Sequence, residues 1–387
     1  MKPIQSWLFL LILAGAPDGL SIGAAKPQEV LHAAPTSRAC GTPIAQLSGL
    51  PSQTKSPVAT RTQVAATPRI SFPDLDEART AFTDDPAYFD QLQPIEMAAK
   101  TGSPLTAGDL AGQRAECRAR YRAGVRQFSD AEKNALVQLV GRIHPALRDD
   151  YPRMAALPWS FLKVSDQIEG GLPHTRGTHI VLSQSACDRS LNRSFLGPGS
   201  TGAIDLLVHE QTHVLQRAQP ELFDSLYVKQ WGFRRATSID ANPWLVEHHL
   251  ANPDALDCRW VFPIEDSQGR RFIWPLVVFG DGPGPKRMPD DFSMVAVHVR
   301  PSGNAFRVEQ QTDGRPATDE LLDVRPYRAV FPMTTNVYHP HEAAAAMLAM
   351  LVVVDRFVPR SAIDPSRREA MERSLAPLRA WFRANLK

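Results

Sequence analysis

Residues 208–215 read Val208-His209-Glu210-Gln211-Thr212-His213-Val214-Leu215. Two histidines four positions apart lie on the same face of an α-helix, so their imidazole rings can bind one metal ion together. Glu210 directly follows the first histidine, where it can reach a water molecule on that ion. The stretch therefore predicts a helix that carries a hydrolytic metal site, with His209 and His213 as ligands and Glu210 as the catalytic base.

The residues around this motif favour a helix buried in a cleft. A capping residue, Ser200 or Thr201, precedes the helix, and Pro220 ends it. Asp205 lies four residues before His209, where it either orients that imidazole or stabilises the helix N-terminus. Additional charges beside the ligands would be costly to bury, and the neighbouring positions are uncharged: Leu206, Leu207, Val208, Gln211, Thr212, Val214 and Leu215.

The motif resembles that of the zincin metallopeptidases. In the metzincin subclass a glycine and a third histidine follow at fixed offsets, but Gln216 and Gln219 occupy those positions here. The resemblance is therefore to thermolysin-type, gluzincin-like enzymes, whose third ligand is a distant glutamate. It implies an α+β catalytic domain in which a mixed sheet places its edge strand over the active-site helix. It also implies bound Zn²⁺ and a peptide or protein substrate.

The third metal ligand is expected downstream, and Glu342 is the preferred candidate. It lies near the start of a helix expected to run to about Arg356, with Pro340 suited to the N-terminus. Four alanines follow it at 343–346, and small side chains allow a second helix to approach the metal helix closely. The alternative ligand is Glu247. The gap before Glu342 is far longer than in thermolysin-like enzymes, and an alanine replaces the aspartate that they carry four residues after the ligand.

A tetrahedral intermediate requires hydrogen-bond donors for its oxyanion. Tyr338 and His341 flank Glu342 and are candidates for this role. His174 is a further candidate, because it belongs to a loop at 171–177 that is bounded by glycines and also carries Arg176.

The N-terminus predicts export. Lys2 precedes an apolar run at 7–14 and small residues that fit a cleavage site, which predicts a signal peptide over 1–25 and a secreted or periplasmic protein. We expect no stable membrane anchor, since no later apolar run is long enough to cross a membrane. The cysteines, at 40, 117, 187 and 258, suit two disulfide bonds in an oxidising compartment. The net charge of +2 argues against a nucleic-acid partner.

Composition divides the remaining chain. Residues 26–70 are rich in Pro, Ser, Thr and Ala and predict a disordered linker or pro-segment, whereas 71–387 predict one catalytic domain. Patterning predicts helices at 108–127, 130–148, 221–232 and 364–386, strands at 159–164 and 178–183, and a β-rich insertion over about 257–335. By its place in the order of elements, the strand at 178–182 is expected to be the edge strand over the cleft.

These features together predict an exported zinc metallopeptidase. The alternative is a catalytically inactive zinc-binding protein that uses a zincin scaffold for recognition or assembly. Glu210 favours the enzyme, because an inactive relative is expected to lose its catalytic base.

Overall fold

The computed structural model describes residues 67–191, 201–255, 257–266, 269–282 and 284–387. The chain divides into two units, Met1–Gln63 and Val64–Lys387, and every described residue belongs to the second unit. The predicted signal peptide, Cys40 and nearly all of the predicted linker lie outside the described residues. The second unit combines helices with mixed sheets, in agreement with the expected α+β class.

Local capping and apolar periodicity account for the long helices. In α5 (Asp130–Asp150), Ser129 and Glu132 form the expected capping box, and Leu136, Val140, Ile143 and Leu147 are buried along one stripe. The other helices are α1 (Leu75–Thr83), α2 (Pro86–Phe89), α3 (Pro94–Thr101), α4 (Leu110–Gly124), α6 (Pro152–Ala155), α7 (Gln184–Leu191), α9 (Gly202–Ala218), α10 (Pro243–His248), α11 (Arg325–Val330), α12 (Pro340–Arg356) and α13 (Pro365–Asn385).

In the described part of the chain, a mixed five-stranded sheet lies beside the motif helix. Its strands are β1 (Ile70–Ser71), β2 (Val125–Arg126), β3 (Trp159–Val164), β4 (His174–Arg176) and β5 (His179–Ser183). β3 pairs in parallel with β1 and β5, whereas β4 runs antiparallel to β5 at the end of the sheet. The expectation that residues 178–182 form the edge strand is wrong, because β5 lies between β3 and β4. The edge strand is β4, which arises from the segment predicted to be a loop.

The expected β-rich region forms a second sheet of seven described strands with a core of its own. These strands are β6 (Arg234–Arg235), β7 (Ile239–Asp240), β8 (Trp260–Asp266), β9 (Gly269–Phe279), β10 (Phe292–Ser302), β11 (Ala305–Val308) and β12 (Thr318–Glu320). The pairs β8–β9, β9–β10 and β10–β11 are antiparallel. β6 and β7 also join this sheet, so it begins earlier in the sequence than the predicted boundary at 257.

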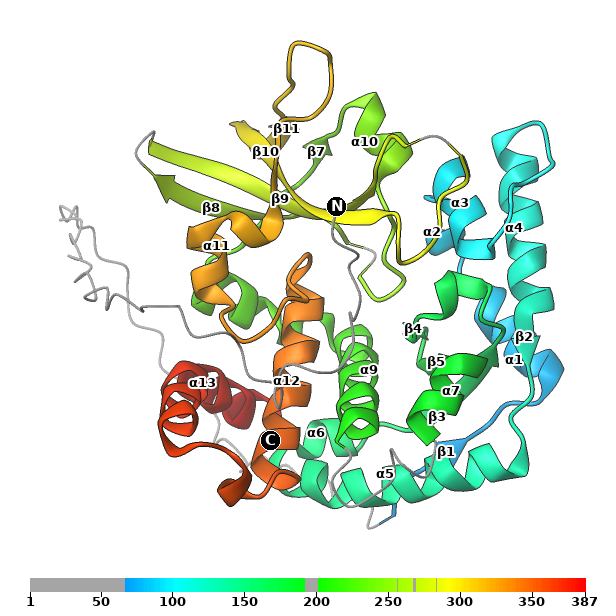
Figure 1. Cartoon of the computed structure of the whole chain (residues 1–387), viewed down its shortest axis with the longest axis vertical. Helices are drawn as coiled ribbons and strands as arrows, with labels where there is room; N and C mark the ends of the chain where they lie inside the picture. The colour runs from blue at the N-terminus through cyan, green and yellow to red at the C-terminus, as the bar shows by residue number, and fades with distance from the viewer. Residues whose placement is uncertain (1–66, 192–200, 256, 267–268, 283) are drawn as a thin grey trace, which may run out of the picture. The chain divides into compact units, whose positions relative to one another are not determined.

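The motif helix α9 packs against β4 and β5 on one side and against α12 on the other (Figure 1). The alanines of α12 at 343–345 are fully buried, as expected for two helices in close approach. α13 packs against α12 and has four buried apolar residues at helical spacing, which are Met371, Leu375, Leu378 and Trp381. This packing brings the motif and a residue more than 120 positions later in the chain to one place.

Three further expectations concern the helix at 221–232, the disulfide bonds and the absence of a membrane anchor. Instead of one helix at 221–232, the chain forms a 3₁₀ turn (Pro220–Leu222) and a π-helical turn (Leu226–Gln230). The expected disulfides are not found in the described residues, where Cys117, Cys187 and Cys258 are free thiols. No helix of the described residues is long and apolar enough to cross a membrane.

Ala345 tests the packing of α12 on α9. It lies three residues after Glu342, on the same helical face, and is fully buried. We expect Ala345→Leu to lower the free energy of unfolding by about 1–3 kcal/mol through overpacking and to weaken metal binding by moving α12 away from α9. Urea denaturation and metal titration measure both effects. Ala380→Leu, on the exposed face of α13, is the control, and equal effects of the two variants would contradict the packing argument.

Candidate metal centre

Two imidazoles and a carboxylate meet between α9 and α12. The Nε2 atoms of His209 and His213 lie 3.0 Å apart, and Glu342 places Oε2 3.3 Å from His209 Nε2 and Oε1 3.7 Å from His213 Nε2. Three ligand atoms at about 2.0–2.1 Å from one ion in tetrahedral geometry lie about 3.3 Å apart. The observed separations, which involve both oxygens of Glu342, are close to that value, so this group of residues could hold one metal ion.

Gln216 sets the protonation of His213. The Gln216 amide nitrogen donates to Tyr227 Oη and to the carbonyl of His341, both at 3.0 Å. Its oxygen therefore faces His213 Nδ1 at 2.7 Å and accepts a hydrogen bond from the Nδ1–H group. Because Nδ1 carries this hydrogen, Nε2 is the nitrogen that faces Glu342 and His209, and its lone pair becomes available to a metal ion when the cluster releases its proton. The sequence offered a signal for this role, because Gln216 lies three residues after His213 on the same helical face.

Two asparagines hold the Glu342 carboxylate. Asn252 donates its amide to Oε1 at 2.6 Å, and Asn336 donates to Oε2 at 2.8 Å. Each carboxylate oxygen keeps a further lone pair that can face the histidines. Neither asparagine was predicted from the sequence, since neither has a fixed spacing from the motif.

Charge within the cluster favours replacement of a proton by a metal ion. Burial acts to lower the pKa of His213, but the Glu342 carboxylate raises it to about 10. Burial acts to raise the pKa of Glu342, but His213 and His209 hold it well below its usual range. The cluster alone therefore retains a proton, and binding of a cation releases it.

Glu210 is buried beside the cluster with its carboxylate oriented. Thr175 of β4 donates its hydroxyl to Glu210 Oε2 at 3.1 Å. Burial, assisted by the negative charge of Asp254, raises the pKa of Glu210 to about 7. A carboxylate with this pKa is suited to accept and return a proton near neutral pH. The role of Thr175 was not visible in the sequence.

The structure separates the predicted oxyanion donors. Tyr338 lies beside Glu342, and both accept hydrogen bonds from the side-chain amide of Asn252, Tyr338 Oη at 3.1 Å and Glu342 Oε1 at 2.6 Å. Burial and then the Glu342 charge raise the pKa of Tyr338 well above its usual value, which keeps its hydroxyl protonated as a donor. His341 instead packs its ring against Tyr227, with the ring centroids 5.4 Å apart.

His174 lies on the other face of the edge strand. Side chains alternate along a strand, so the contact of Thr175 with Glu210 places His174 and Arg176 on the opposite face of β4. His174 is buried, with Nδ1 3.1 Å from the carbonyl of Leu172 and its ring 5.9 Å from that of Phe82. The structure therefore does not bring His174 to the group formed by His209, His213 and Glu342.

Glu247 and Asp205 were also considered from the sequence. Glu247 is exposed on α10 and does not join the cluster, so Glu342, and not Glu247, lies with the two histidines in the group that could hold a metal ion. Asp205 lies in the first turn of α9, where burial raises its pKa to about 6 while the charge of His209 opposes this change.

The backbone of the β4 edge is already occupied. The Thr175 N–H donates to Asp254 Oδ1 at 2.6 Å, and Arg217 donates to the Thr175 carbonyl at 3.4 Å. Arg217 also donates to the carbonyl of Pro253. In this conformation an extended peptide cannot pair with the backbone of β4 at Thr175, although an exposed strand edge can bind a peptide in this way.

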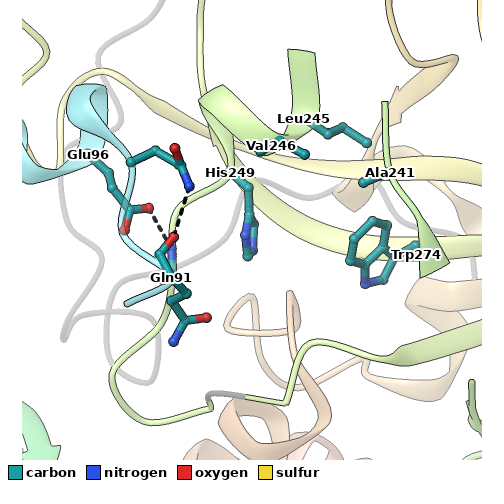
Figure 2. Close-up of a pocket in the computed structure, with 9 residues that line it drawn as sticks. Gln91, Glu96, Ala241, Leu245, Val246, His249 and Trp274 are labelled. Carbon is teal, nitrogen blue, oxygen red and sulfur yellow. Dashed lines mark hydrogen bonds between the residues drawn. The ribbon is translucent and has the colours of Figure 1, made fainter. Parts of the chain in front are cut away.

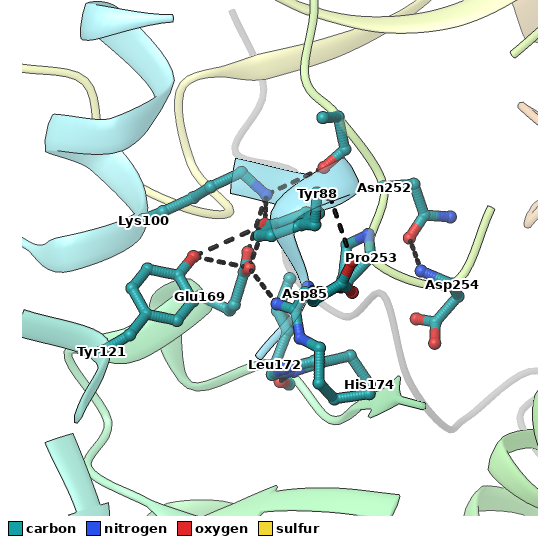
Figure 3. A network of polar contacts seen from close by, with 12 residues as sticks. Asp85, Tyr88, Lys100, Tyr121, Glu169, Leu172, His174, Asn252, Pro253 and Asp254 are labelled. Carbon is teal, nitrogen blue, oxygen red and sulfur yellow. Dashed lines mark hydrogen bonds and ion pairs between the residues drawn. The ribbon is translucent and has the colours of Figure 1, made fainter. Parts of the chain in front are cut away.

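A buried polar network lies on the face of β4 that carries His174 and Arg176, opposite Thr175 (Figure 3). Lys100 Nζ lies 2.8 Å from Glu169 Oε2 and 2.6 Å from Tyr88 Oη, and Tyr121 donates to Glu169 Oε1 at 2.6 Å. Arg176 stacks on the Tyr88 ring, with its guanidinium carbon 3.8 Å from the ring centroid. Ion pairs buried this deeply are costly to break, because removal of one partner leaves the other charge uncompensated.

A small pocket lies beside the cluster but does not include it. Glu96, His249 and Trp274 are among its lining residues (Figure 2). Ala251 also lines the pocket, whereas its neighbour Asn252 contacts Glu342. Consecutive residues of one short segment of chain therefore contact the pocket and the candidate metal ligand.

Comparison with known proteins gives no relative: no family model, curated protein or solved structure matches this chain. The function must therefore be inferred from the geometry and chemistry of its own residues.

The assignment of the third ligand can be tested directly. We expect Glu342→Ala to reduce the bound metal to a small fraction of one ion per chain, since a site with two histidines lacks its anionic donor. Glu247→Ala is the control and should keep full occupancy. Atomic absorption after dialysis measures both variants, and full occupancy in Glu342→Ala would refute the assignment.

Glu96 provides a test of buried charge near this site. Burial raises its pKa to about 7 from an ordinary value near 4.5. Between these pH values the folded state holds a proton that the unfolded state has lost, so stability falls as the pH rises through this range. We expect Glu96→Gln to remove this part of the pH dependence and to be more stable than wild type at pH 7.

Thermal unfolding at pH 4.5, 6 and 7 measures the effect of Glu96→Gln. Glu372→Gln, at an exposed carboxylate, should follow the wild-type profile. A profile for Glu96→Gln that is parallel to wild type would show that Glu96 ionises normally.

Proposed function

We propose that this protein is an exported zinc metallopeptidase with a gluzincin-like site on a zincin-like scaffold. The observation that carries the proposal is the approach of Glu342 to both motif histidines, with Glu210 buried beside them. Two imidazoles and one carboxylate form a donor set typical of catalytic zinc sites, which leave one coordination position open. Export is proposed from the sequence pattern of residues 1–25 alone.

Each side chain has a role in this proposal. His209, His213 and Glu342 would hold Zn²⁺, with Gln216 fixing the tautomer of His213. When bound, zinc supplies Lewis-acid polarisation of the scissile carbonyl and lowers the pKa of a water molecule. Glu210 accepts the proton of the attacking water and passes it to the leaving amine.

Two further residues assist these steps. The hydroxyl of Thr175 holds the Glu210 carboxylate in place, with an Oγ1 to Oε2 distance of 3.1 Å. The protonated hydroxyl of Tyr338, beside Glu342, is the best placed of the predicted donors to stabilise the oxyanion.

One observation favours a second candidate function, a zinc-binding protein without peptidase activity. Asp254 and Arg217 occupy the backbone groups of Thr175, so the edge that an extended substrate would use is closed in this conformation. Glu210 distinguishes the two functions, because metal binding does not require it whereas hydrolysis does.

The test is Glu210→Gln. We expect this variant to bind zinc as wild type does, since all three ligands remain, and to lose several orders of magnitude in kcat for peptide hydrolysis. A quenched-fluorescent peptide library measures hydrolysis, and Glu221→Gln at an exposed position just after α9 is the control. A zinc-loaded wild-type protein that cleaves no member of the library would favour the non-enzymatic function.

A further inference from the structure

Residues 250–255, which we call the strap, connect the two sheets across the metal centre. At one end, Leu250 N–H donates to the carbonyl of Val277 in β9 at 3.0 Å. At the other end, Asp254 accepts the Thr175 N–H of β4 at 2.6 Å. Leu250 therefore fixes the start of the strap to the seven-stranded sheet, and Asp254 fixes its later part to the five-stranded sheet.

The middle of the strap presents one carboxamide to the proposed metal ligand. Asn252 donates to Glu342 Oε1 at 2.6 Å and to Tyr338 Oη at 3.1 Å, while its own Oδ1 accepts from Asp254 N–H at 2.9 Å. Both ends of the amide have partners, so its orientation is determined. The amide nitrogen of Asn252 is therefore held in an orientation that faces Glu342.

The buried polar network also binds the strap, through hydrogen bonds to the backbone of Ala251. Ala251 donates its N–H to Glu96 Oε2 at 3.0 Å, and its carbonyl accepts from Lys100 Nζ at 2.8 Å. Lys100 is in turn held by Glu169 at 2.8 Å, and both side chains are almost completely buried (Figure 3). The Lys100–Glu169 ion pair is therefore connected to Glu342 through two consecutive residues of the strap.

We propose that Asn252 is a positioning residue for the metal ligand Glu342, and that the Lys100–Glu169 pair acts on the metal centre through Asn252. This inference rests on the proposed metal binding but not on peptidase activity. A carboxylate held by a fixed amide loses less rotational freedom when it ligates an ion, and hydrogen-bonded partners of metal ligands commonly contribute about 10–100-fold to affinity. Asn336 supports the other oxygen of the same carboxylate.

The first experiment compares zinc affinity, by chelator competition, in wild type, Asn252→Ala and Asn252→Gln. We expect Asn252→Ala to weaken binding about 10–100-fold and Asn252→Gln to restore part of the loss, because glutamine retains the amide donor. The visible absorption of the Co²⁺-loaded protein should change in Asn252→Ala, since it reports on the geometry around the ion. Asn304→Ala, at an exposed asparagine, is the control.

The second experiment tests whether the Lys100–Glu169 ion pair affects zinc binding. Lys100→Met alone would leave Glu169 buried without its partner, so the double variant Lys100→Met/Glu169→Gln is used. We expect it to weaken zinc binding in the same direction as Asn252→Ala. Lys163→Met/Glu132→Gln is the matched control, because this second Lys–Glu pair, at 2.8 Å and partly buried, links α5 to β3 without contacting the strap.

Combining the Lys100→Met/Glu169→Gln and Asn252→Ala changes gives the decisive measurement. If the ion pair acts through Asn252, the triple variant binds zinc within about twofold of Asn252→Ala alone; multiplied effects would show independent action and overturn this part of the proposal. Unchanged zinc affinity and an unchanged Co²⁺ spectrum in folded Asn252→Ala would overturn the proposal as a whole.

The two proposals fail in different ways. A wild-type protein that binds neither metal would refute the metal centre and the positioning role together. A wild-type protein that binds zinc tightly but hydrolyses no peptide would refute only the peptidase. In that case the affinities of the Asn252 variants still decide the positioning role.

Discussion

The close packing of α12 on α9 brings the Glu342 carboxylate to the two imidazoles of the motif, and the candidate site depends on this contact. Alanines 343–345 are fully buried in α12, and small side chains where two helices meet allow their axes to come close. A buried carboxylate has a high desolvation cost unless charges and donors compensate it. His209 and His213 supply the charge and Asn252 and Asn336 the donors, so the local structure around α12 is organised to keep one anion in place.

The surrounding polar groups extend this arrangement across the domain. Gln216 links His213 to Tyr227 and to the backbone of α12, while Thr175 links Glu210 to the five-stranded sheet. The strap then joins that sheet to β9 of the other sheet and passes the metal cluster on the way. Each of these contacts joins elements far apart in the sequence, so the geometry of the site is a property of the assembled domain.

The edge of β4 is closed by side chains. Asp254 and Arg217 bond the Thr175 backbone groups, so an extended peptide cannot pair with the strand there in this conformation. The pocket beside the strap is lined in part by His249, Trp274 and Ala251, and the residue after Ala251, Asn252, contacts Glu342.

The sequence by itself determined the local features. The spacing of His209, Glu210 and His213 predicted their shared helix, the capping box predicted α5, and Pro340 predicted the start of α12, which has Glu342 in its first turn. These succeed because helical periodicity and capping depend on residues within one or two turns. The tertiary structure alone decided that β4 is the edge strand, that His174 lies away from the cluster, and that Asn252 and Asn336 hold Glu342. A three-residue strand has too little periodicity to recognise, and an asparagine reveals no partner until distant segments have packed together.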